Sequence, residues 1–422
     1  MSLPAILQLL DRIADRCGLL HQPLRPERLI ARAARRAGSS DFGDIPFHEP
    51  LARLLGACAS ESAPSLVGRI ATRWDVLRFL GNLLRLAEED ARDPAIRAEP
   101  IARPIFITGL PRSGTSFLHR LLLQDPDNFA PLVWQTIAPY PPAAGPDRRV
   151  AEVEAQLRMF ARCAPEFPGL HPLSATSPQE CSEIGAHVFR SLRFDTTYRV
   201  PSYRRWLDHA GLLPAYRFER RFLQHLQHQR RLADPSAGPG RWVLKCPDHV
   251  FALDDLRAAF PDARIVFVHR DPIKVLVSVA KLTEVLRRPF SRAVDPVAIG
   301  RGEAERWLLG TERMQAAAAA DGFATPICHV HHTELVRDPV GAVRRLYRHF
   351  DLSLEPGAAA SMGRLVTLQP RGGYAHDAYR FADHGLDPDT EREKFRPYME
   401  YFGVRPESAT PAPVRGGLSA AA

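Results

Sequence analysis

The stretch from residue 104 to residue 118 constrains the fold more than any other part of the chain. Residues 104–108 are apolar or β-prone and predict a short buried strand. Gly109 and Gly114 then interrupt the pattern, and apolar residues return at helical spacing from Phe117 onward. In a strand–loop–helix unit, the N–H groups of the loop and of the first helical turn converge on one point. The stretch therefore predicts a site for a phosphate or sulfate group.

The same loop has the Gly-x-x-x-x-Gly-Lys-Ser/Thr spacing of a nucleotide-binding P-loop, with one departure. The pattern runs from Gly109 to Ser116, and Thr115 stands where the lysine is expected. That lysine contacts the terminal phosphates of a nucleoside triphosphate, so its replacement argues against an ATPase or a kinase. Three alternatives stay open: a nucleotide kinase or NTPase, a non-catalytic nucleotide-binding interaction protein, and an ordinary turn whose glycines serve only the backbone.

The charge of the chain permits an anionic ligand. The formal charge is +8 and the pI is near 9.4. The basic residues are spread along the chain rather than gathered in one block, so this balance does not require nucleic acid. The basic run Arg32, Arg35 and Arg36 predicts a solvated helix face, with a nucleic-acid patch as the less favoured alternative. We therefore expect no nucleic-acid partner.

The cysteines and the apolar runs bear on the cellular compartment. The six cysteines are scattered, without a Cys-x-x-Cys pair, and predict reduced thiols in a cytoplasmic protein. Charged residues such as Asp11 and Arg12 interrupt the apolar pattern near the N-terminus, so we expect no signal peptide. No segment reaches the roughly 20 apolar residues that span a bilayer, so we expect no transmembrane segment.

The pattern of elements predicts how the chain is organised. Helical periodicity dominates residues 1–100, which we expect to form a helical N-terminal extension. Residues 101–404 are expected to form an α/β domain, and residues 405–422, rich in Pro, Ala, Ser and Gly, a disordered tail. Three further strands, each followed by a helix, are predicted at 241–245, 264–269 and 327–331. Strands separated by helices predict a central parallel sheet with right-handed crossovers, an α/β fold class.

Several polar segments should meet at one edge of this sheet. Ligands of parallel sheets lie beyond the carboxyl ends of the strands. The loop 109–116, Lys245 at the end of one strand and the turn 269–271 at the end of another should gather there. The sequence therefore predicts one anion-binding edge built from three separate segments.

Two motifs resemble those of the sulfotransferase family, whose members transfer a sulfuryl group from 3′-phosphoadenosine 5′-phosphosulfate (PAPS). The stretch 110–118, Leu-Pro-Arg-Ser-Gly-Thr-Ser-Phe-Leu, resembles the loop that holds the 5′-phosphosulfate. The segment from Arg270, after a strand, to Ser278, in the next helix, resembles the element that holds the 3′-phosphate. An arginine fork and a helix-borne hydroxyl suit a terminal phosphate. The alternative for Arg270 is an ion pair with Asp271.

The resemblance covers about residues 104–402 and is to the larger bacterial sulfotransferases with a helical N-terminal extension. It implies a P-loop-like three-layer fold, PAPS as co-substrate and no metal. The residues that it assigns to the nucleotide are Arg112, Ser113, Gly114, Thr115, Ser116, Arg270 and Ser278.

The chemistry of sulfuryl transfer suggests which residues act in it. Negative charge develops on the sulfuryl oxygens and the leaving phosphate, where fixed cations and N–H groups stabilise it. Arg112 suits this role, and Lys245 either shares it or covers the sheet edge with its stem. The acceptor hydroxyl must lose its proton to a histidine or a carboxylate. His171 and Glu180 are the candidates, with His171 slightly preferred for its ordinary pKa near neutrality. Gln135 cannot act as a base.

The acceptor is the least determined part of the prediction. The aromatic residues between 189 and 218 are predicted to lie mainly in the core, with a ligand cleft as the alternative. They favour an apolar or ring-bearing alcohol among the possible acceptors, which are a small molecule, a lipid or a glycan that carries a hydroxyl or an amine. The sequence leaves the oligomeric state open.

Overall fold

The protein is described by a computed structural model, which covers residues 3–142, 145–236, 238, 240–320, 322–369 and 380–407. Its centre is a five-stranded sheet with the order β2-β3-β1-β4-β5, and all the pairs are parallel. The strands are β1 (Ile105–Gly109), β2 (Asn128–Phe129), β3 (Arg241–Lys245), β4 (Arg264–His269) and β5 (Cys328–His331). The central strand β1 pairs with β3 and β4, so that Ile105 lies opposite Val243 and Arg264.

The predicted central parallel sheet is confirmed. The predicted strands 241–245 and 264–269 have the observed bounds, and the third begins at Cys328, one residue after its predicted start. The sequence does not predict β2, because its two residues, Asn128 and Phe129, are too few to show a periodic pattern.

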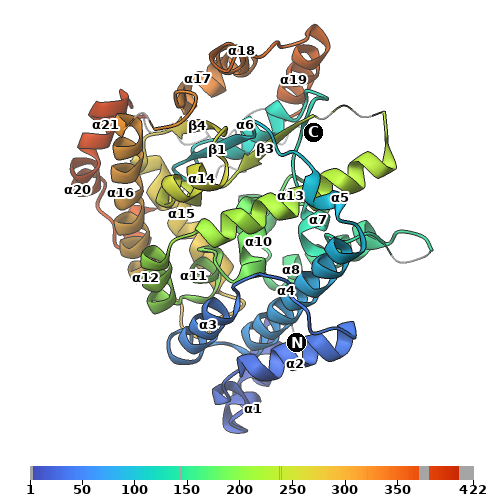
Figure 1. The fold of residues 1–422 in the computed structure, drawn as a ribbon. Helices are drawn as coiled ribbons and strands as arrows, with labels where there is room; N and C mark the ends of the chain where they lie inside the picture. The colour runs from blue at the N-terminus through green and yellow to red at the C-terminus, as the bar shows by residue number, and fades with distance from the viewer. Residues whose placement is uncertain are drawn as a thin grey trace, which may run out of the picture.

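Helices cover both faces of the sheet, which gives the three predicted layers (Figure 1). On one face, Ile107 and Val266 pack with α6 (Thr115–Leu122), α18 (Pro339–His349) and α19 (Pro356–Leu368). On the other, Phe106 and Ile265 pack with α13 (Leu213–Ala233), α14 (Leu253–Ala259), α15 (Pro272–Arg287) and α16 (Pro296–Ala320). Successive side chains of a strand point to opposite faces, so the strands must be apolar throughout.

The N-terminal residues form helices, as their periodicity predicts. These are α1 (Leu3–Arg16), α2 (Pro26–Ala37), α3 (His48–Glu61) and α4 (Leu66–Arg92). They occupy the lower part of the molecule in Figure 1. Phe79 and Leu83 of α4 are fully buried in the same apolar core as Phe106 of β1. The N-terminal helices therefore complete the core of the α/β part.

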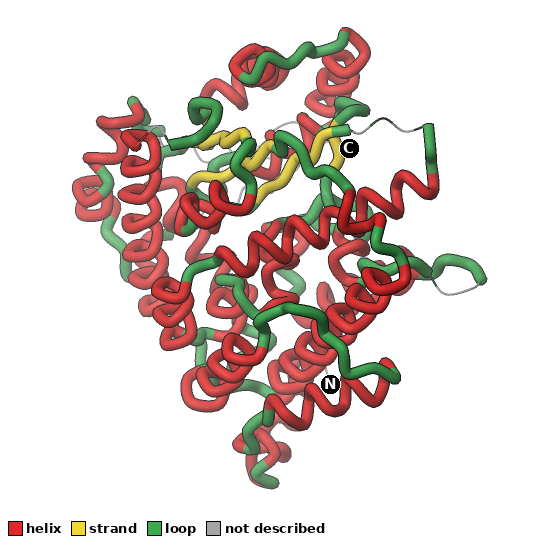
Figure 2. Tube along the Cα trace, viewed as in Figure 1, coloured by secondary structure: helices red, strands yellow, loops and turns green. Residues whose placement is uncertain are grey.

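The rest of the chain is also mainly helical, and the strands occupy one end of the molecule (Figure 2). The remaining α-helices are α5 (Ala95–Ala98), α7 (Val133–Ile137), α8 (Arg149–Cys163), α9 (Phe167–Leu170), α10 (Cys181–Gly185), α11 (Arg193–Tyr198), α12 (Pro201–Ala210), α17 (His332–Arg337), α20 (Pro388–Lys394) and α21 (Arg396–Phe402). Short 3-10 helices lie at Leu19–His21, Ala186–Val188, Pro247–Phe251 and Phe381–His384. Among the described residues, every helix is too short or too polar to traverse a lipid bilayer.

Two other expectations can be compared with the structure. Phe189, Phe194 and Tyr203 are at most 1% exposed, so this part of the aromatic segment lies in the core, as predicted. The expected disordered tail begins inside the described chain, because residues 405–407 have defined positions and Glu407 contacts Arg270. The rest of that tail, 408–422, lies outside the described residues.

Candidate active site

The loop between β1 and α6 depends on glycine at two positions. Gly109 has φ +129°, and a Cβ there would lie 2.4 Å from the carbonyl oxygen of Val268 on β4, so glycine lets the two strands approach. Gly114 has φ +97° and immediately precedes α6. Arg112, between them, also has a positive φ, +60°. This backbone turns the loop sharply and leaves the N-terminus of α6 facing the edge of the sheet.

The structure brings the two predicted nucleotide-binding motifs into contact. Arg112 Nε donates a hydrogen bond to Ser278 Oγ at 3.0 Å, although these residues belong to different motifs. Its Nη1 donates to the carbonyl oxygen of Leu170 at 3.0 Å. Arg270 Nη1 donates to the carbonyl oxygen of Arg112 at 2.7 Å. The two motifs therefore form one continuous basic surface at the carboxyl ends of β1 and β4.

Arg270 has a carboxylate partner that sequence reasoning missed. Its Nε and Nη2 donate to the two carboxylate oxygens of Glu407 at 2.9 and 3.0 Å, a bidentate pair. Burial raises the pKa of Glu407, but its bonds with His332 and Arg270 outweigh burial and lower the pKa to about 2. Glu407 is therefore ionised throughout the neutral range. No pattern in a Pro- and Ala-rich terminal segment connects it with an arginine so far away in the sequence.

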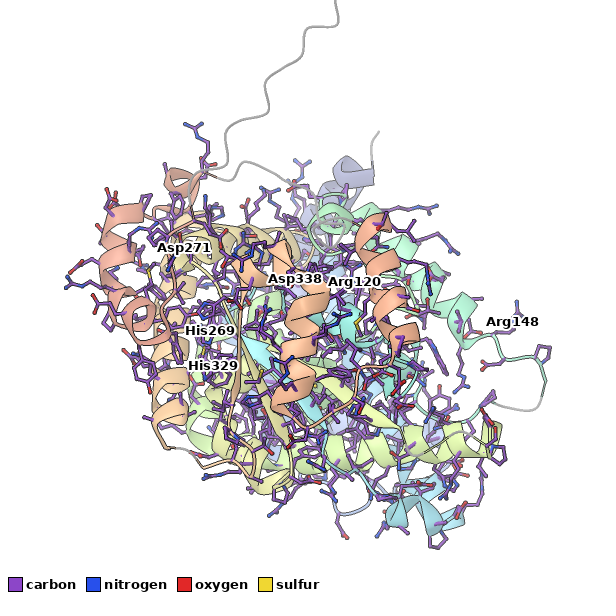
Figure 3. All side chains as sticks on the ribbon, turned by 90° about the horizontal axis from the view of Figure 1, so that it is seen from above. Arg120, Arg148, His269, Asp271, His329 and Asp338 are labelled. Carbon is purple, nitrogen blue, oxygen red and sulfur yellow. The ribbon has the colours of Figure 1, made fainter. Side chains whose placement is uncertain are left out.

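The predicted alternative for Arg270, an ion pair with Asp271, is not what the structure shows. The Asp271 side chain instead accepts a hydrogen bond from the N–H of Ile273 at 3.0 Å and so caps α15. It also pairs with Arg392, at 3.3 Å. Asp271 lies close to His269, which stacks on His329 of the neighbouring strand (Figure 3). These contacts fix the end of β4 and leave the guanidinium of Arg270 directed toward the loop.

The other residues assigned to the nucleotide have different surroundings. Ser113 is fully buried, and its hydroxyl donates to the carbonyl oxygen of Leu110 at 2.6 Å, so it stabilises the loop from inside. Gly114, Thr115 and Ser116 line the large cavity described below. Ser278, on α15, lines it as well.

Lys245 forms an ion pair with Glu180 beside the loop. The Nζ atom of Lys245, at the end of β3, also donates to Ser116 Oγ at 3.0 Å. Its side chain is 4% exposed, against 26% for Glu180. Lys245 is therefore a fixed, buried cation that contacts both Ser116 after the loop and the carboxylate of Glu180.

The two candidate bases lie on the same side of the cavity, and both have lowered pKa values. Burial lowers the pKa of His171 to about 4, against the opposing effect of the Glu180 charge. Burial raises the pKa of Glu180, but the charge of Lys245, together with His171, outweighs burial and holds the pKa below its ordinary value. At neutral pH, His171 is therefore neutral and Glu180 is ionised, so both can accept a proton.

The candidate residues adjoin one cavity of about 1310 Å³. Its polar end is lined by Arg112, Ser116, Glu180, Arg270 and Ser278. Its other end is apolar, and the lining there comes from three helices. Those residues are Val67, Ile70 and Trp74 of α4, Leu157, Met159 and Phe160 of α8, and Leu282 and Leu286 of α15.

Three polar cavity residues were not identified from the sequence. Asp248 follows β3, and burial together with the nearby Glu180 raises its pKa to about 7. Its position just beyond a strand end was a signal that could have identified it. Glu303, within α16, and Lys274, in the first turn of α15, also line the cavity, but the sequence gives no sign of the helix face they occupy.

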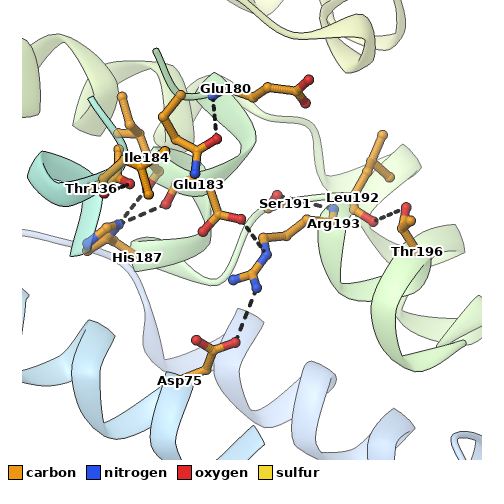
Figure 4. A network of polar contacts seen from close by, with 12 residues as sticks. Asp75, Thr136, Glu180, Glu183, Ile184, His187, Ser191, Leu192, Arg193 and Thr196 are labelled. Carbon is orange, nitrogen blue, oxygen red and sulfur yellow. Dashed lines mark hydrogen bonds and ion pairs between the residues drawn. The ribbon is translucent and has the colours of Figure 1, made fainter. Parts of the chain in front are cut away.

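An ion-pair network forms part of the cavity wall. Arg193 contacts Glu183 at 2.9 Å and Asp75 at 3.3 Å, and so links α11 to both α10 and α4 (Figure 4). The Glu180 side chain points away from this network (Figure 4). Asp75 also accepts a hydrogen bond from the hydroxyl of Tyr198 at 3.3 Å. The N-terminal helix α4 is thereby held against the cavity.

Gln135 and His119 both make hydrogen-bond contacts within the fold. Gln135 Oε1 accepts a hydrogen bond from the N–H of Leu132 at 2.9 Å, so it caps the start of α7. His119 is 1% exposed, and its Nε2 lies 2.9 Å from the carbonyl oxygen of Val243, which places it in the core. Within the described part of the chain, no three His, Cys, Asp or Glu side chains are grouped as metal ligands. The absence of a metal from the reaction stays a prediction.

Comparisons with known proteins agree with this geometry. The model of the sulfotransferase family matches residues 104–356. Omega-hydroxy-beta-dihydromenaquinone-9 sulfotransferase Stf3 from Mycobacterium tuberculosis and from Mycobacterium bovis is 27% identical over 286 residues. The match covers 64% of this chain and 65% of these relatives, so the chain spans just under two thirds of their length.

Solved structures share the fold over nearly the whole chain. Sulfotransferase STF1 from Mycobacterium tuberculosis H37Rv is 30% identical, with a TM-score of 0.75 over 88% of this chain and 98% of that one. Sulfotransferase STF9 from Mycobacterium avium is 27% identical, with a TM-score of 0.79 over 90% of this chain and 97% of that one. They extend the agreement to the N-terminal helices and confirm the P-loop-like fold. The chain belongs to the sulfotransferase family.

Proposed function

We propose that this protein transfers the sulfuryl group of PAPS to a hydroxyl on an apolar, lipid-like acceptor. The observation that carries the proposal is the single cavity, which has the two nucleotide motifs and Glu180 at one end and an apolar lining at the other. The relative named for an omega-hydroxylated menaquinone derivative supports an acceptor of this kind. A sugar would leave most of the apolar lining without a matching surface.

The residues present fit a nucleotide with two separate anionic groups. The N–H groups at the start of α6, with Thr115 and Ser116, suit the 5′-phosphosulfate. Arg270 and Ser278 suit the 3′-phosphate, because a guanidinium binds such a group through two parallel hydrogen bonds. Glu407 occupies these two N–H groups of Arg270 with its own two oxygens, which supports their role in holding an anionic group.

The catalytic roles follow from the positions of the charges. Arg112 lies in the loop and Lys245 beside it, and fixed cations there stabilise the negative charge that develops during transfer. Glu180 accepts the proton of the acceptor hydroxyl as the hydroxyl oxygen attacks sulfur. The bond between sulfur and the 5′-phosphate oxygen breaks, and 3′-phosphoadenosine 5′-phosphate leaves. Movement of Lys245 toward the sulfuryl oxygens would weaken its pair with Glu180 and make that carboxylate more basic.

The geometry favours Glu180 over His171 as the general base, although the sequence slightly prefers His171. Glu180 is paired with Lys245, which also contacts Ser116 of the loop, so its carboxylate is fixed relative to the reacting group. His171 is less basic than an ordinary histidine, since burial lowers its pKa to about 4. His171 remains the alternative, because it lines the same cavity.

Calorimetry with two nucleotides tests the donor. We expect tight binding of 3′-phosphoadenosine 5′-phosphate and weak binding of ATP, because Thr115 replaces the lysine of a P-loop kinase. Titrations of each nucleotide with and without magnesium show whether binding depends on the metal, as it does in a kinase or an NTPase. Magnesium-dependent ATP binding that exceeds binding of the other nucleotide would favour the kinase or NTPase alternative instead.

The acceptor class is tested by turnover. The protein is incubated with PAPS and either a long-chain isoprenoid alcohol in detergent or a set of oligosaccharides, and sulfated products are measured by mass spectrometry. We expect product from the isoprenoid alcohol. Product from the oligosaccharides alone would show that the acceptor is a glycan and that the apolar lining serves another purpose.

A further inference from the structure

The apolar end of the cavity opens at a surface that exposes large apolar side chains. Ile70, Trp74 and Met159 line the cavity and are nevertheless 61%, 46% and 56% exposed. They belong to α4 and α8, which frame the opening. Single exposed apolar residues are ordinary, but a group around an opening indicates an interaction site.

The apolar surface continues onto α1. Leu9, Leu10 and Ile13 of this helix are 43–50% exposed. Helix α1 lies against the start of α4, where the N–H of Leu66 donates to Asp11 Oδ1 at 2.6 Å. The two helices that carry these exposed apolar side chains, α1 and α4, are therefore neighbours.

A cluster of arginines lies beside the opening. Arg32 of α2 is close to Arg73 of α4, whose charge is the largest cause of a lowered pKa at Arg32, and the charges of Arg36 and Arg35 on the same helix lower it further. Arg73 precedes Trp74 in the chain, and Arg36 and Trp74 line the same small secondary cavity. Among the described residues, no carboxylate forms an ion pair with any of these four arginines. The cluster is thus an uncompensated positive patch at the rim of an apolar opening.

We propose that this surface, formed by Ile70, Trp74 and Met159 with the four arginines, docks on an anionic lipid bilayer. An indole ring suits the boundary between headgroups and acyl chains, and each arginine gains attraction from anionic headgroups. The mouth of the cavity then faces the bilayer, so an apolar alcohol can enter without crossing water. The proposal rests on the apolar acceptor proposed above and adds where that acceptor is collected.

Sedimentation with lipid vesicles tests the docking directly. The full-length protein is mixed with vesicles of phosphatidylcholine, with or without phosphatidylglycerol, and the bound fraction is measured at low and high salt. We expect binding to the anionic vesicles that weakens as salt screens the charges. Equal binding to both kinds of vesicle, or no binding to either, would overturn the proposal.

Variants separate the apolar and the charged contributions. Trp74→Ser combined with Met159→Ser should lower vesicle affinity at least tenfold. Arg32→Gln, Arg36→Gln and Arg73→Gln should each lower it about fivefold. The matched controls are Leu232→Ser, 68% exposed at the end of α13, and Arg313→Gln, exposed on α16, and both should bind as the wild type does. Loss of affinity in the controls as large as in the surface variants would contradict a specific docking surface.

Nucleotide binding and sedimentation velocity distinguish a failure of the docking proposal from a failure of the proposed function. Binding of 3′-phosphoadenosine 5′-phosphate should survive in every surface variant, which also shows that the variant is folded. A protein that binds the nucleotide but not vesicles would overturn the docking alone, whereas one that binds vesicles but not the nucleotide would overturn the donor. If sedimentation velocity shows a dimer that Trp74→Ser dissociates, and vesicles do not bind, the surface joins two copies of the chain instead.

Discussion

At the scale of single residues, Glu180 and Lys245 pair the proposed general base with a cation that we propose to stabilise the developing charge. Lys245 is buried at the end of β3, and Glu180 lies on the cavity side of it. A charged pair in this position keeps the carboxylate ionised and orients it. The pair therefore allows a direct test of which residue is the base.

We expect Glu180→Gln to lower turnover about a hundredfold while nucleotide affinity stays near that of the wild type, as loss of a general base predicts. His171→Ala should have a smaller effect on the rate constant of turnover. Turnover of an identified acceptor is measured for each variant, with calorimetry of 3′-phosphoadenosine 5′-phosphate as the control. A larger loss in His171→Ala would reverse the assignment, and near-normal turnover in both would place the base elsewhere.

The buried carboxyl group of Glu219, on α13, should make the free energy of unfolding depend on pH. It is 3% exposed, and burial raises its pKa to about 8. One of its carboxylate oxygens has no hydrogen-bond partner among the described residues. The folded protein therefore holds a proton on Glu219 that the unfolded chain releases at its ordinary pKa, near 4.5. Its contribution to stability is complete below that ordinary pKa and is lost as pH rises through the folded value.

Glu219→Gln should remove this pH dependence, because glutamine carries no titrating proton. Relative to the wild type, the variant should gain stability between about pH 5 and about pH 8, by roughly 1.4 kcal/mol for each pH unit. Urea unfolding at several pH values measures the difference. Glu312→Gln, at an exposed position on α16, is the control and should follow the wild type. Parallel curves for Glu219→Gln and the wild type would show that Glu219 is ionised in the fold.

The sequence located single residues well wherever a motif fixes their backbone. Arg112, Arg270 and Ser278 lie together because a strand end, a glycine-bearing loop and a helix start determine where each one points. Glu407 could not be found in this way, since its place depends on long-range packing. Its carboxylate reaches the site from a terminal segment without a recognisable pattern.

At the scale of elements, the described residues after α21 are held against the proposed nucleotide site by hydrogen bonds of Glu407. The N–H of Glu407 donates to Asp271 Oδ2 at 2.8 Å, while its carboxylate pairs with Arg270. Asp271 is the residue that caps α15, so the segment is anchored to the second nucleotide motif by both backbone and side chain. In the proposed function, a 3′-phosphate must displace this carboxylate to bind the two N–H groups of Arg270 that Glu407 occupies.

We expect Glu407→Gln to raise affinity for 3′-phosphoadenosine 5′-phosphate about tenfold, because the competing charge-assisted bonds are lost. Arg270→Ala should lower the affinity roughly ten- to a hundredfold, which confirms that the same site is measured. Calorimetry at constant ionic strength gives both values. Glu393→Gln removes an exposed carboxylate of α20 and is the control for net charge. Weaker binding by Glu407→Gln would mean that Glu407 supports the site rather than competes for it.

The sequence predicted elements according to their length and their pattern. Strands β3 and β4 have apolar residues between their charged ends, and their predicted bounds agree with the structure. Strand β2 and helix α7 are not predicted, because elements of two to five residues show no periodicity. Hydrogen bonds to more distant segments hold them, such as that from the N–H of Val133 to the carbonyl oxygen of Ser177, at 2.9 Å.

At the scale of the whole molecule, the cavity lies between the N-terminal extension and the α/β part, which the sequence predicts as two separate regions. Its polar end belongs to the sheet, whereas α4 of the N-terminal extension supplies Ile70 and Trp74 at its apolar end. Sequence periodicity marks α4 as helical but cannot tell which residues of another segment it meets. The position of the acceptor cavity therefore follows only from the assembled fold.

The same packing predicts that the α/β part needs its N-terminal helices. Phe79 of α4 is fully buried, and its ring lies 5.9 Å from that of Phe189 and 6.2 Å from that of Phe194. Asp75 of α4 balances the buried charge of Arg193. A chain that begins at residue 101 would expose this apolar surface and leave Arg193 without its Asp75 partner, and both changes destabilise the fold.

We therefore expect the fragment 101–422 to lack a cooperative thermal transition and to bind 3′-phosphoadenosine 5′-phosphate poorly, although it contains both nucleotide motifs. Circular dichroism and calorimetry of the purified fragment measure the two properties. Leu83→Ala in the full chain is the graded control, because it opens a cavity in the same core and should cost about 2–5 kcal/mol without unfolding the protein. A fragment that melts cooperatively and binds the nucleotide as the full chain does would show that residues 101–404 fold alone, and that the N-terminal helices serve only the acceptor side of the cavity.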